Sequence, residues 1–152
     1  MPSFEAQKPF TIEAPATTPS VPERPSVTGP DSAERDGDPP TFDVVTGSNQ
    51  YYVFEITSDP QLFNDSSRRT SDNFYATWDD SSAPSRLTGA SYTLSQDAWD
   101  RLKSADQLWF RIGTTSSETD WDNYAVSTDD DQGDSAPSLE VTGERVYAGA
   151  ST

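Results

Sequence analysis

The sequence predicts an all-β protein, an antiparallel β-sandwich with one short helix and an extended proline-rich N-terminal arm. Two stretches, Gln50–Phe63 and Gln107–Thr115, alternate apolar and polar residues with the period of a half-buried strand. Between the short apolar segments, turn signals recur roughly every 8–15 residues, and only one segment has a helical pattern. Short strands at this spacing are typical of two packed antiparallel sheets.

Residues 1–40 differ in composition from the rest of the chain. They hold nine of the 12 prolines, which prevent helix formation at this density and favour extended backbone. Phe10 and Ile12 alternate with polar neighbours and are predicted to contribute a strand or to dock on a neighbouring subunit. Residues 29–40 are predicted to be a polar hinge. The sandwich domain itself is expected to span residues 41–152.

The first strands of the domain follow directly after the arm. Residues 41–46 form a predicted strand, and residues 47–49 form a turn from residue types that tolerate positive φ. The central strand at 50–57 has one apolar face, made of Tyr52, Phe54 and Ile56. Pro60 cannot donate to a β-ladder, so this strand ends before it.

The middle of the chain predicts two short strands and the single helix. Residues 73–78 and 91–94 have strand character and lie between polar loops. Ser95 is a suitable N-cap, and Trp99 and Leu102 are three residues apart on one helical face. We therefore expect one to two helical turns that end by Ser104.

The second central strand, residues 107–115, has an apolar face of Leu108, Phe110 and Ile112. We expect this face to meet that of the first central strand in one core. Residues 121–128 form a further predicted strand. The segment 138–148 is predicted to be a last strand, or a hairpin that turns at Gly143 and Glu144.

These segments resemble the bacterial fibronectin type III-like repeats, which have an immunoglobulin-like sandwich. The resemblance lies in YYVFEITSDPQLF, SYTL, LWFRIGTTSS and a last strand led by Trp121, and it covers about residues 40–128. It implies that residues 41–46, 51–57, 91–94, 107–115 and 121–128 are the second, third, fifth, sixth and seventh strands. The first strand would then lie in the arm. The family implies binding, spacing and adhesion roles, and it carries over no catalytic residue.

Composition excludes several functions. The formal net charge of -16 opposes binding to nucleic acid or to an anionic membrane. Cys and His are absent, which removes thiol nucleophiles, imidazole bases and the usual zinc ligands. No stretch approaches the roughly 20 apolar residues of a membrane span. With 26 acidic residues, neighbouring carboxylates are expected by chance, so we predict that the protein is not an enzyme.

Two groups of residues are candidate sites. Asp129, Asp131 and Asp134 lie in an acidic loop and offer oxygen ligands for calcium, although a solvated loop is the simpler interpretation. Trp109 and Arg111 are of types enriched at protein interfaces, and we predict that they bind a partner together with the two arm residues.

The aromatic side chains allow another interpretation. Trp78, Trp109, Trp121 and Tyr124 could form a platform for sugar rings, or they could be packing residues. Trp109 is expected at the surface, because Leu108, Phe110 and Ile112 already occupy the inner face. Trp121 is expected in the core.

The leading functional hypothesis is a non-enzymatic structural or adhesion module that assembles with itself or with other subunits. A carbohydrate-binding module that uses exposed tryptophans is the alternative, and a calcium-stabilised adhesin is the third candidate. The first residues have no basic and apolar signal sequence. We therefore expect a virion decoration or tail, or an injection-system component assembled inside a cell. A surface-filament subunit is the alternative if the start of the chain is processed.

Overall fold

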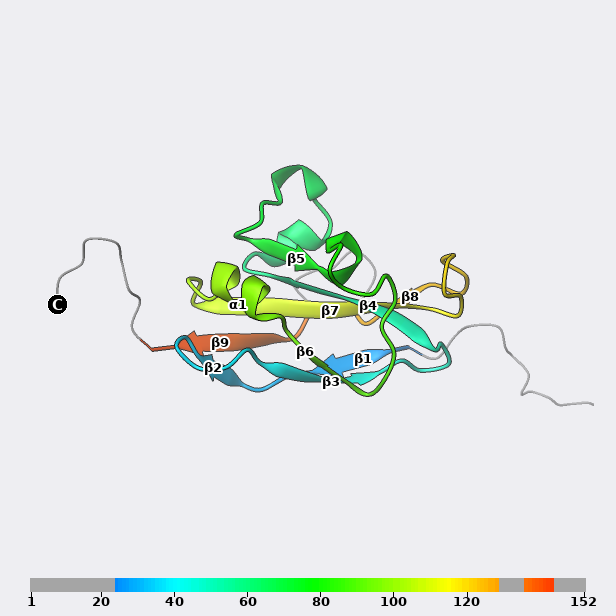
Figure 1. The fold of residues 1–152 in the computed structure, drawn as a ribbon, viewed down its shortest axis with the longest axis horizontal. Coiled ribbons are helices and arrows are strands. Elements are labelled where there is room, and N and C mark those ends of the chain that lie inside the picture. Colours follow the sequence, from blue (N-terminus) through cyan, green and yellow to red (C-terminus); the bar gives the residue numbers. More distant parts are fainter. Residues whose placement is uncertain (1–23, 129–135, 144–152) are drawn as a thin grey trace, which may run out of the picture.

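The computed structural model describes residues 24–128 and 136–143, which form two β-sheets (Figure 1). The smaller sheet has the order β1-β3-β6 and is antiparallel throughout. Its strands are β1 (Ser26–Thr28), β3 (Thr41–Val45) and β6 (Ser91–Thr93). In Figure 1 this sheet lies beneath the long strands of the larger one. The predicted all-β sandwich architecture is therefore confirmed.

The larger sheet has the order β2-β9-β7-β4-β5, and β8 also pairs with β7. Its strands are β2 (Ser32–Glu34), β4 (Tyr51–Thr57), β5 (Phe74–Ala76), β7 (Gln107–Thr115), β8 (Ala125–Val126) and β9 (Ser138–Thr142). The pair β2–β9 is parallel, whereas the other pairs are antiparallel. The prediction of a purely antiparallel sandwich is therefore wrong at this one edge.

The core confirms that the two predicted apolar faces meet. Strands β4 and β7 are neighbours, with Phe54 opposite Ile112 and Ile56 opposite Phe110, so both faces lie side by side on one sheet. Phe42 of β3 packs onto them from the other sheet, with ring centroids 4.8 Å from Phe54 and 4.7 Å from Phe110. Burial of these large side chains is the main force that joins the sheets.

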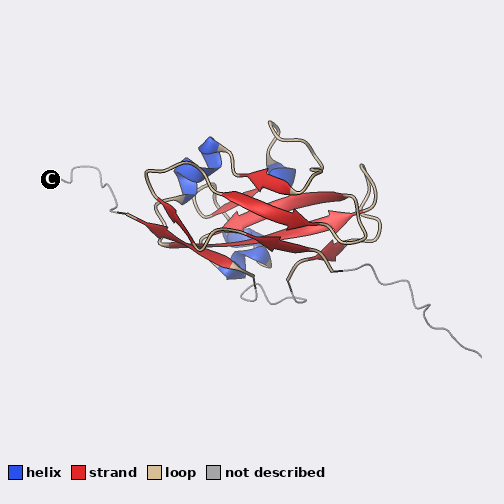
Figure 2. Ribbon diagram, turned by 90° about the horizontal axis from the view of Figure 1, so that it is seen from below, coloured by secondary structure: helices blue, strands red, loops and turns tan. Residues whose placement is uncertain are grey.

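The predicted helix is confirmed as α1 (Gln96–Leu102). The Ser95 hydroxyl accepts a hydrogen bond from the Ala98 N–H at 3.2 Å, as an N-cap does, and Trp99 and Leu102 are buried. The described part of the chain has three further helical turns, all of the 3-10 type: η2 (Pro60–Phe63), η3 (Ser66–Arg68) and η4 (Thr77–Asp79). Figure 2 shows the helical segments around the margin of the strands.

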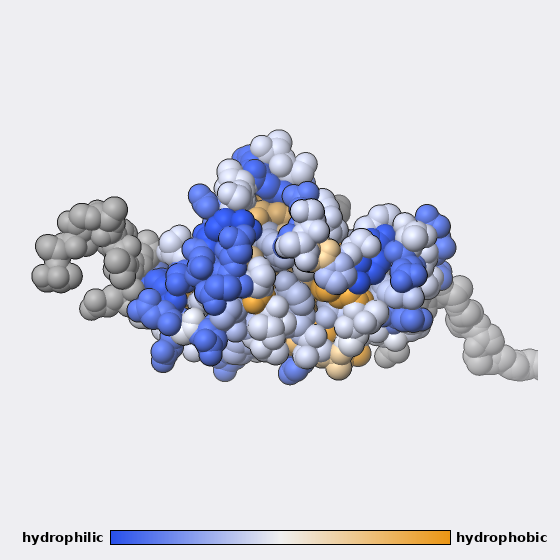
Figure 3. Space-filling view, viewed as in Figure 1, coloured by the Kyte–Doolittle hydropathy of each residue, from blue (hydrophilic) through white to orange (hydrophobic). Residues whose placement is uncertain are grey.

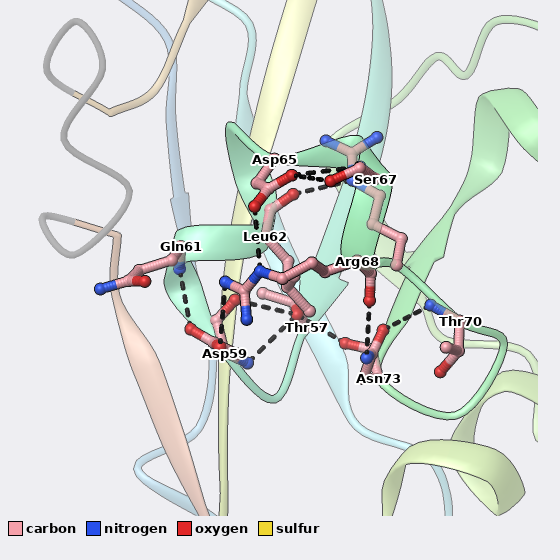
Figure 4. Close-up of polar contacts among 10 residues, drawn as sticks. Thr57, Asp59, Gln61, Leu62, Asp65, Ser67, Arg68, Thr70 and Asn73 are labelled. Atoms are coloured by element: carbon pink, nitrogen blue, oxygen red, sulfur yellow. Dashed lines mark hydrogen bonds and ion pairs between the residues drawn. The ribbon is translucent and has the colours of Figure 1, made fainter.

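The loop between β4 and β5 is held together by its own polar side chains (Figure 4). Asp59 caps η2 by accepting from the Gln61 N–H, and Asp65 caps η3 by accepting from the Ser67 N–H. Arg68 donates to Asp65 at 2.9 Å. The loop therefore has a fixed path despite its polar sequence.

The residues predicted to be a polar hinge are partly a strand, β2. The guanidinium of the buried Arg35, directly after β2, donates to the carbonyls of Lys103, Ala105 and Gly143. A buried charge is costly unless it has hydrogen-bond partners, and these three carbonyls supply them to the guanidinium. The polar segment around Arg35 can therefore join the sheet. Val27 of β1 is also buried in the core. Residues 24–40 thus contribute two strands to the sandwich.

Two predicted strands are shorter in the structure. Strand β5 ends at Ala76, because the Phe54 N–H donates to the Thr77 hydroxyl instead of to a backbone carbonyl. In the segment 121–128 only β8 is a strand. It pairs with Gly113 and Thr114, while β9 pairs with the other end of β7. The part of the final segment after residue 143 lies outside the described residues.

Candidate functional site

A pocket of about 460 Å³ opens on the face of β4 and β7 that points away from the core. Val53, Glu55, Trp78, Trp121 and Tyr124 line it. The first two alternate along β4 with the buried core residues, so they face the opposite side of the sheet. The volume lies within the range of about 300–1,000 Å³ that small-molecule sites occupy.

The floor of the pocket contains a carboxylate with two partners. Arg111 lies opposite Glu55 on the neighbouring strand, and its Nε donates to Glu55 Oε1 at 2.6 Å. Both side chains are only 11% exposed. Arg111 also donates to the Phe63 carbonyl at 3.1 Å and lies 4.6 Å from the Phe63 ring centroid. Its guanidinium is thus held toward Phe63, whereas Glu55 lines the pocket.

Trp78 forms one wall, and its position follows from η4. The hydrogen bond from the Phe54 N–H to the Thr77 hydroxyl, 3.0 Å long, holds this turn against β4. Trp78 Nε1 then donates to Glu55 Oε2 at 2.7 Å. The indole is therefore oriented by the same carboxylate that forms the floor.

Trp121 and Tyr124 form the other wall. Their rings contact edge to face, with centroids 5.2 Å apart, and the Arg86 guanidinium lies 3.9 Å from the Trp121 centroid. The Tyr124 ring lies over Gly113 of β7, where an added Cβ would be 2.7 Å from the hydroxyl oxygen. Such close approach explains a glycine in the interior of a strand.

The loop that carries this wall is tied to the end of β7. The Thr115 hydroxyl donates to the carbonyls of Asp120 and Asp122, at 3.0 and 2.9 Å. The buried Asn49 amide donates to the Asn123 carbonyl at 2.7 Å. Asn123 has a φ of 54°, a left-handed conformation that asparagine tolerates. The aromatic wall is thus preorganised by bonds to buried side chains.

Tyr124 remains a neutral phenol at physiological pH. Desolvation of the hydroxyl, which lies over Gly113, raises its pKa, and the negative charge of Glu55 raises it further. Arg111 has the opposite and smaller effect on this pKa. The hydroxyl therefore keeps its proton and can both donate and accept hydrogen bonds.

Four large hydrophobic side chains are exposed among the described residues. Three of them line this pocket: Trp78 at 43%, Trp121 at 48% and Tyr124 at 50% exposure. The fourth, Val45 at 57%, belongs to β3 of the other sheet. On the face drawn in Figure 3 the surface is mostly hydrophilic, with only small hydrophobic areas.

The prediction that Trp121 lies in the core is wrong. Trp121 lies in the loop between β7 and β8 and is 48% exposed, and within residues 121–128 only the two residues of β8 are a strand. Trp109 is half-buried and packs against a second small cluster, made of Leu62, Phe63, Phe74, Ala76 and Ala136. Three of the four aromatic residues proposed for a platform thus come together, and Trp109 does not join them.

Two of the predicted partner-binding residues lie beside the second cluster. Trp109 packs against the second cluster, and the Arg111 guanidinium lies over the ring of Phe63, a member of that cluster. Their role in partner binding stays a prediction. Phe10, Ile12, Asp129, Asp131 and Asp134 lie outside the described residues. Within residues 24–128 and 136–143, no group of three or more acidic side chains is placed to hold a metal ion.

The sequence analysis missed Glu55, Arg86 and Gly113 as site residues. For Glu55, the signal was a charged residue on the outward face of a central strand, with Arg111 on the outward face of the other central strand. For Gly113, it was a glycine inside a strand pattern, which indicates close approach of another group. Arg86 gave no comparable signal in the sequence.

A second, polar pocket of about 280 Å³ lies near Tyr75 and α1. Two of its carboxylates already have partners: Asp80 accepts from Tyr75 and Ser82, and Asp97 accepts from Arg101. The aromatic pocket is therefore the better candidate for a ligand.

Comparison with known proteins gave no match to a family model, to a curated protein or to a solved structure. In the described part of the chain, no helix has the length and apolar character to cross a membrane.

Proposed function

We propose that this protein is a carbohydrate-binding module that holds a sugar ring between Trp78 and the pair of Trp121 and Tyr124. The observation that carries this proposal is that, of the four large hydrophobic side chains exposed within residues 24–128 and 136–143, three are aromatic and line one pocket. Contiguous exposed apolar surface marks interaction sites, whereas a single exposed side chain is ordinary. Aromatic faces offer a sugar ring a flat apolar surface for its C–H groups.

Polar groups at the floor and edge of the pocket suit the hydroxyls of a sugar. Each carboxylate oxygen of Glu55 accepts one hydrogen bond within the protein and keeps a further lone pair. The protonated Tyr124 hydroxyl can donate or accept. An apolar pocket with a few fixed polar groups is the usual design of small-ligand sites.

We also infer that the sandwich is of the fibronectin type III-like kind. In the expected mapping, β1, β3 and β6 are the first, second and fifth strands, and they share one sheet. The third and sixth strands, β4 and β7, are neighbours in the other sheet. Immunoglobulin-like sandwiches distribute these strands in the same way. A recognition module on such a scaffold is consistent with a site on the sheet surface.

A glycan panel with matched variants tests the binding proposal. The wild-type protein should bind at least one class of immobilised glycan. The variant Trp121→Ala should bind the same glycan with an affinity at least about tenfold lower. Val45→Ala is the control, because it also removes an exposed hydrophobic side chain but from the other sheet. Absence of binding to any glycan, or equal binding by Trp121→Ala, would overturn the proposal.

A further inference from the structure

We propose that the aromatic pocket takes a ligand with a positively charged nitrogen, and therefore prefers amino sugars to neutral or acidic sugars. This inference rests on the proposed carbohydrate binding for the sugar part of the ligand. The charge preference follows independently from the residues that line the pocket.

The first observation is the charge of the floor. Among the described residues that line the pocket, Glu55 is the one acidic side chain and none is basic. Its side chain is only 11% exposed, so its charge acts through a medium of lower dielectric than water. Arg111 balances this charge from the far side, where the Phe63 carbonyl and ring hold its guanidinium. Glu55 raises the pKa of the Tyr124 hydroxyl by more than Arg111 lowers it.

The second observation is that the walls are suited to cations. The face of an aromatic ring attracts a cation within about 6 Å of its centroid, and Trp is the strongest of the three aromatic types. Trp121 already holds the guanidinium of Arg86 at 3.9 Å from its centroid. Trp78 and Tyr124 have no such cation among the described residues, and both face the pocket.

The third observation is the acidic surrounding. Asp120 and Asp122 flank Trp121 in the sequence, and both are exposed. The formal net charge of the chain is -16. Such a field attracts a cation and repels the carboxylate of an acidic sugar. Arg86 and Arg111 each contact a lining residue of the pocket, and both are engaged with it: Arg86 lies over the Trp121 ring and Arg111 binds Glu55.

Calorimetric titration of the full chain with five probes tests this inference. Glucosamine carries the ammonium group, N-acetylglucosamine and glucose are its neutral counterparts, glucuronic acid is the anion, and choline is a cation without a sugar ring. At pH 6 and low salt, we expect glucosamine to bind at least about tenfold more tightly than the neutral sugars. Glucuronic acid should bind most weakly.

The outcomes separate this inference from the proposed function. Equal affinity for glucosamine and glucose, or a preference for glucuronic acid, overturns the charge preference and leaves carbohydrate binding standing. Binding of choline without any sugar supports the cation preference and overturns the carbohydrate module. Absence of binding by all five probes overturns both.

The variant Glu55→Gln tests whether Glu55 causes the preference for glucosamine. Glu55→Gln keeps the shape of the side chain and removes its charge, so the preference for glucosamine should fall to within about twofold of glucose. Because this change leaves Arg111 without its ion-pair partner, folding is checked by circular dichroism. The comparison of glucosamine with N-acetylglucosamine on the wild-type protein needs no variant, and it decides the inference by itself if Glu55→Gln does not fold.

Discussion

Glu55 connects the stability of the sheet with the geometry of the pocket. One carboxylate oxygen binds Arg111 across the β4–β7 pair, and the other binds the indole of Trp78. Because the ion pair is largely buried, each charge depends on the other for compensation. Removing one partner of such a pair costs far more than replacing both, since the remaining charge stays buried without its counterion.

Arg111→Met should therefore destabilise the protein by about 3–5 kcal/mol. The double variant Glu55→Gln with Arg111→Met should recover a large part of this loss, because it leaves no uncompensated charge. Urea unfolding followed by tryptophan fluorescence measures both free energies. A single variant as stable as the wild type would show that the pair is not the buried contact described here.

Gly113 tests whether the position of Tyr124 matters for binding. In Gly113→Ala the new Cβ would lie 2.7 Å from the hydroxyl oxygen, so the ring must move out of its place. Ligand affinity should fall several-fold. Gly89→Ala is the control: its Cβ meets no atom within 4 Å, although its φ of +105° makes alanine strained there. A loss of stability without loss of binding is expected for the control, and equal affinities for both variants would contradict the assignment.

At the scale of elements, the turn after β5 makes stability depend on pH. Asp80 follows η4 and accepts hydrogen bonds from Ser82 and Tyr75, which lower its pKa below the usual value. A carboxyl group with a lowered folded-state pKa stabilises the fold above its unfolded-state pKa, near about 4. This contribution is lost as the pH falls through the folded-state pKa.

Asp80→Asn should consequently reduce the acid sensitivity of the protein. Urea midpoints measured between pH 6 and pH 2.5 should decline less steeply for the variant than for the wild type. The difference between the two proteins should be largest at pH 6. Parallel decline of the two curves would show that Asp80 has no part in the acid transition.

The strands were predictable where side-chain alternation and burial agree. Strand β7 has the predicted bounds, and β4 differs from its prediction by a single residue, because their alternating faces match the core and the exterior. β2 was not predictable. Its sequence SAE has little apolar character, and it depends on the distant carbonyls that Arg35 binds.

The pocket was predictable only in part. Aromatic residues outside the two core faces pointed to Trp78, Trp121 and Tyr124 as a possible platform. Their convergence depends on side-chain bonds from Thr77, Thr115 and Asn49 to distant backbone groups. No local pattern encodes such bonds, so the orientation of Trp121 could not be derived from the sequence.

At the scale of the whole molecule, the sandwich includes part of the predicted arm. Deletion of residues 1–40 would remove β1 and β2 together with the buried Val27 and Arg35. It should therefore destabilise the domain strongly. Deletion of residues 1–23 keeps every strand of the two sheets and should leave the fold intact. Thermal unfolding of the two truncated proteins checks this difference, and equal melting temperatures would contradict it.

The predicted assembly role is tested by molar mass in solution. If Phe10 and Ile12 connect subunits, the full chain should form an assembly by light scattering, and the protein without residues 1–23 should be monomeric. The variant Phe10→Ser with Ile12→Ser is the matched control with the chain length kept. An unchanged oligomeric state in all three proteins would contradict this role.

The central claim is that the aromatic pocket is the ligand site, and the indole N–H signals in a ¹H–¹⁵N NMR spectrum test it most directly. The chain has four tryptophans, of which Trp78 and Trp121 line the pocket. Trp99 is buried in the core, and Trp109 packs against the second cluster. On addition of glucosamine, we predict that the signals of Trp78 and Trp121 shift while those of Trp99 and Trp109 stay. Shifts at Trp109 alone, or none at any tryptophan with any sugar, would contradict the claim.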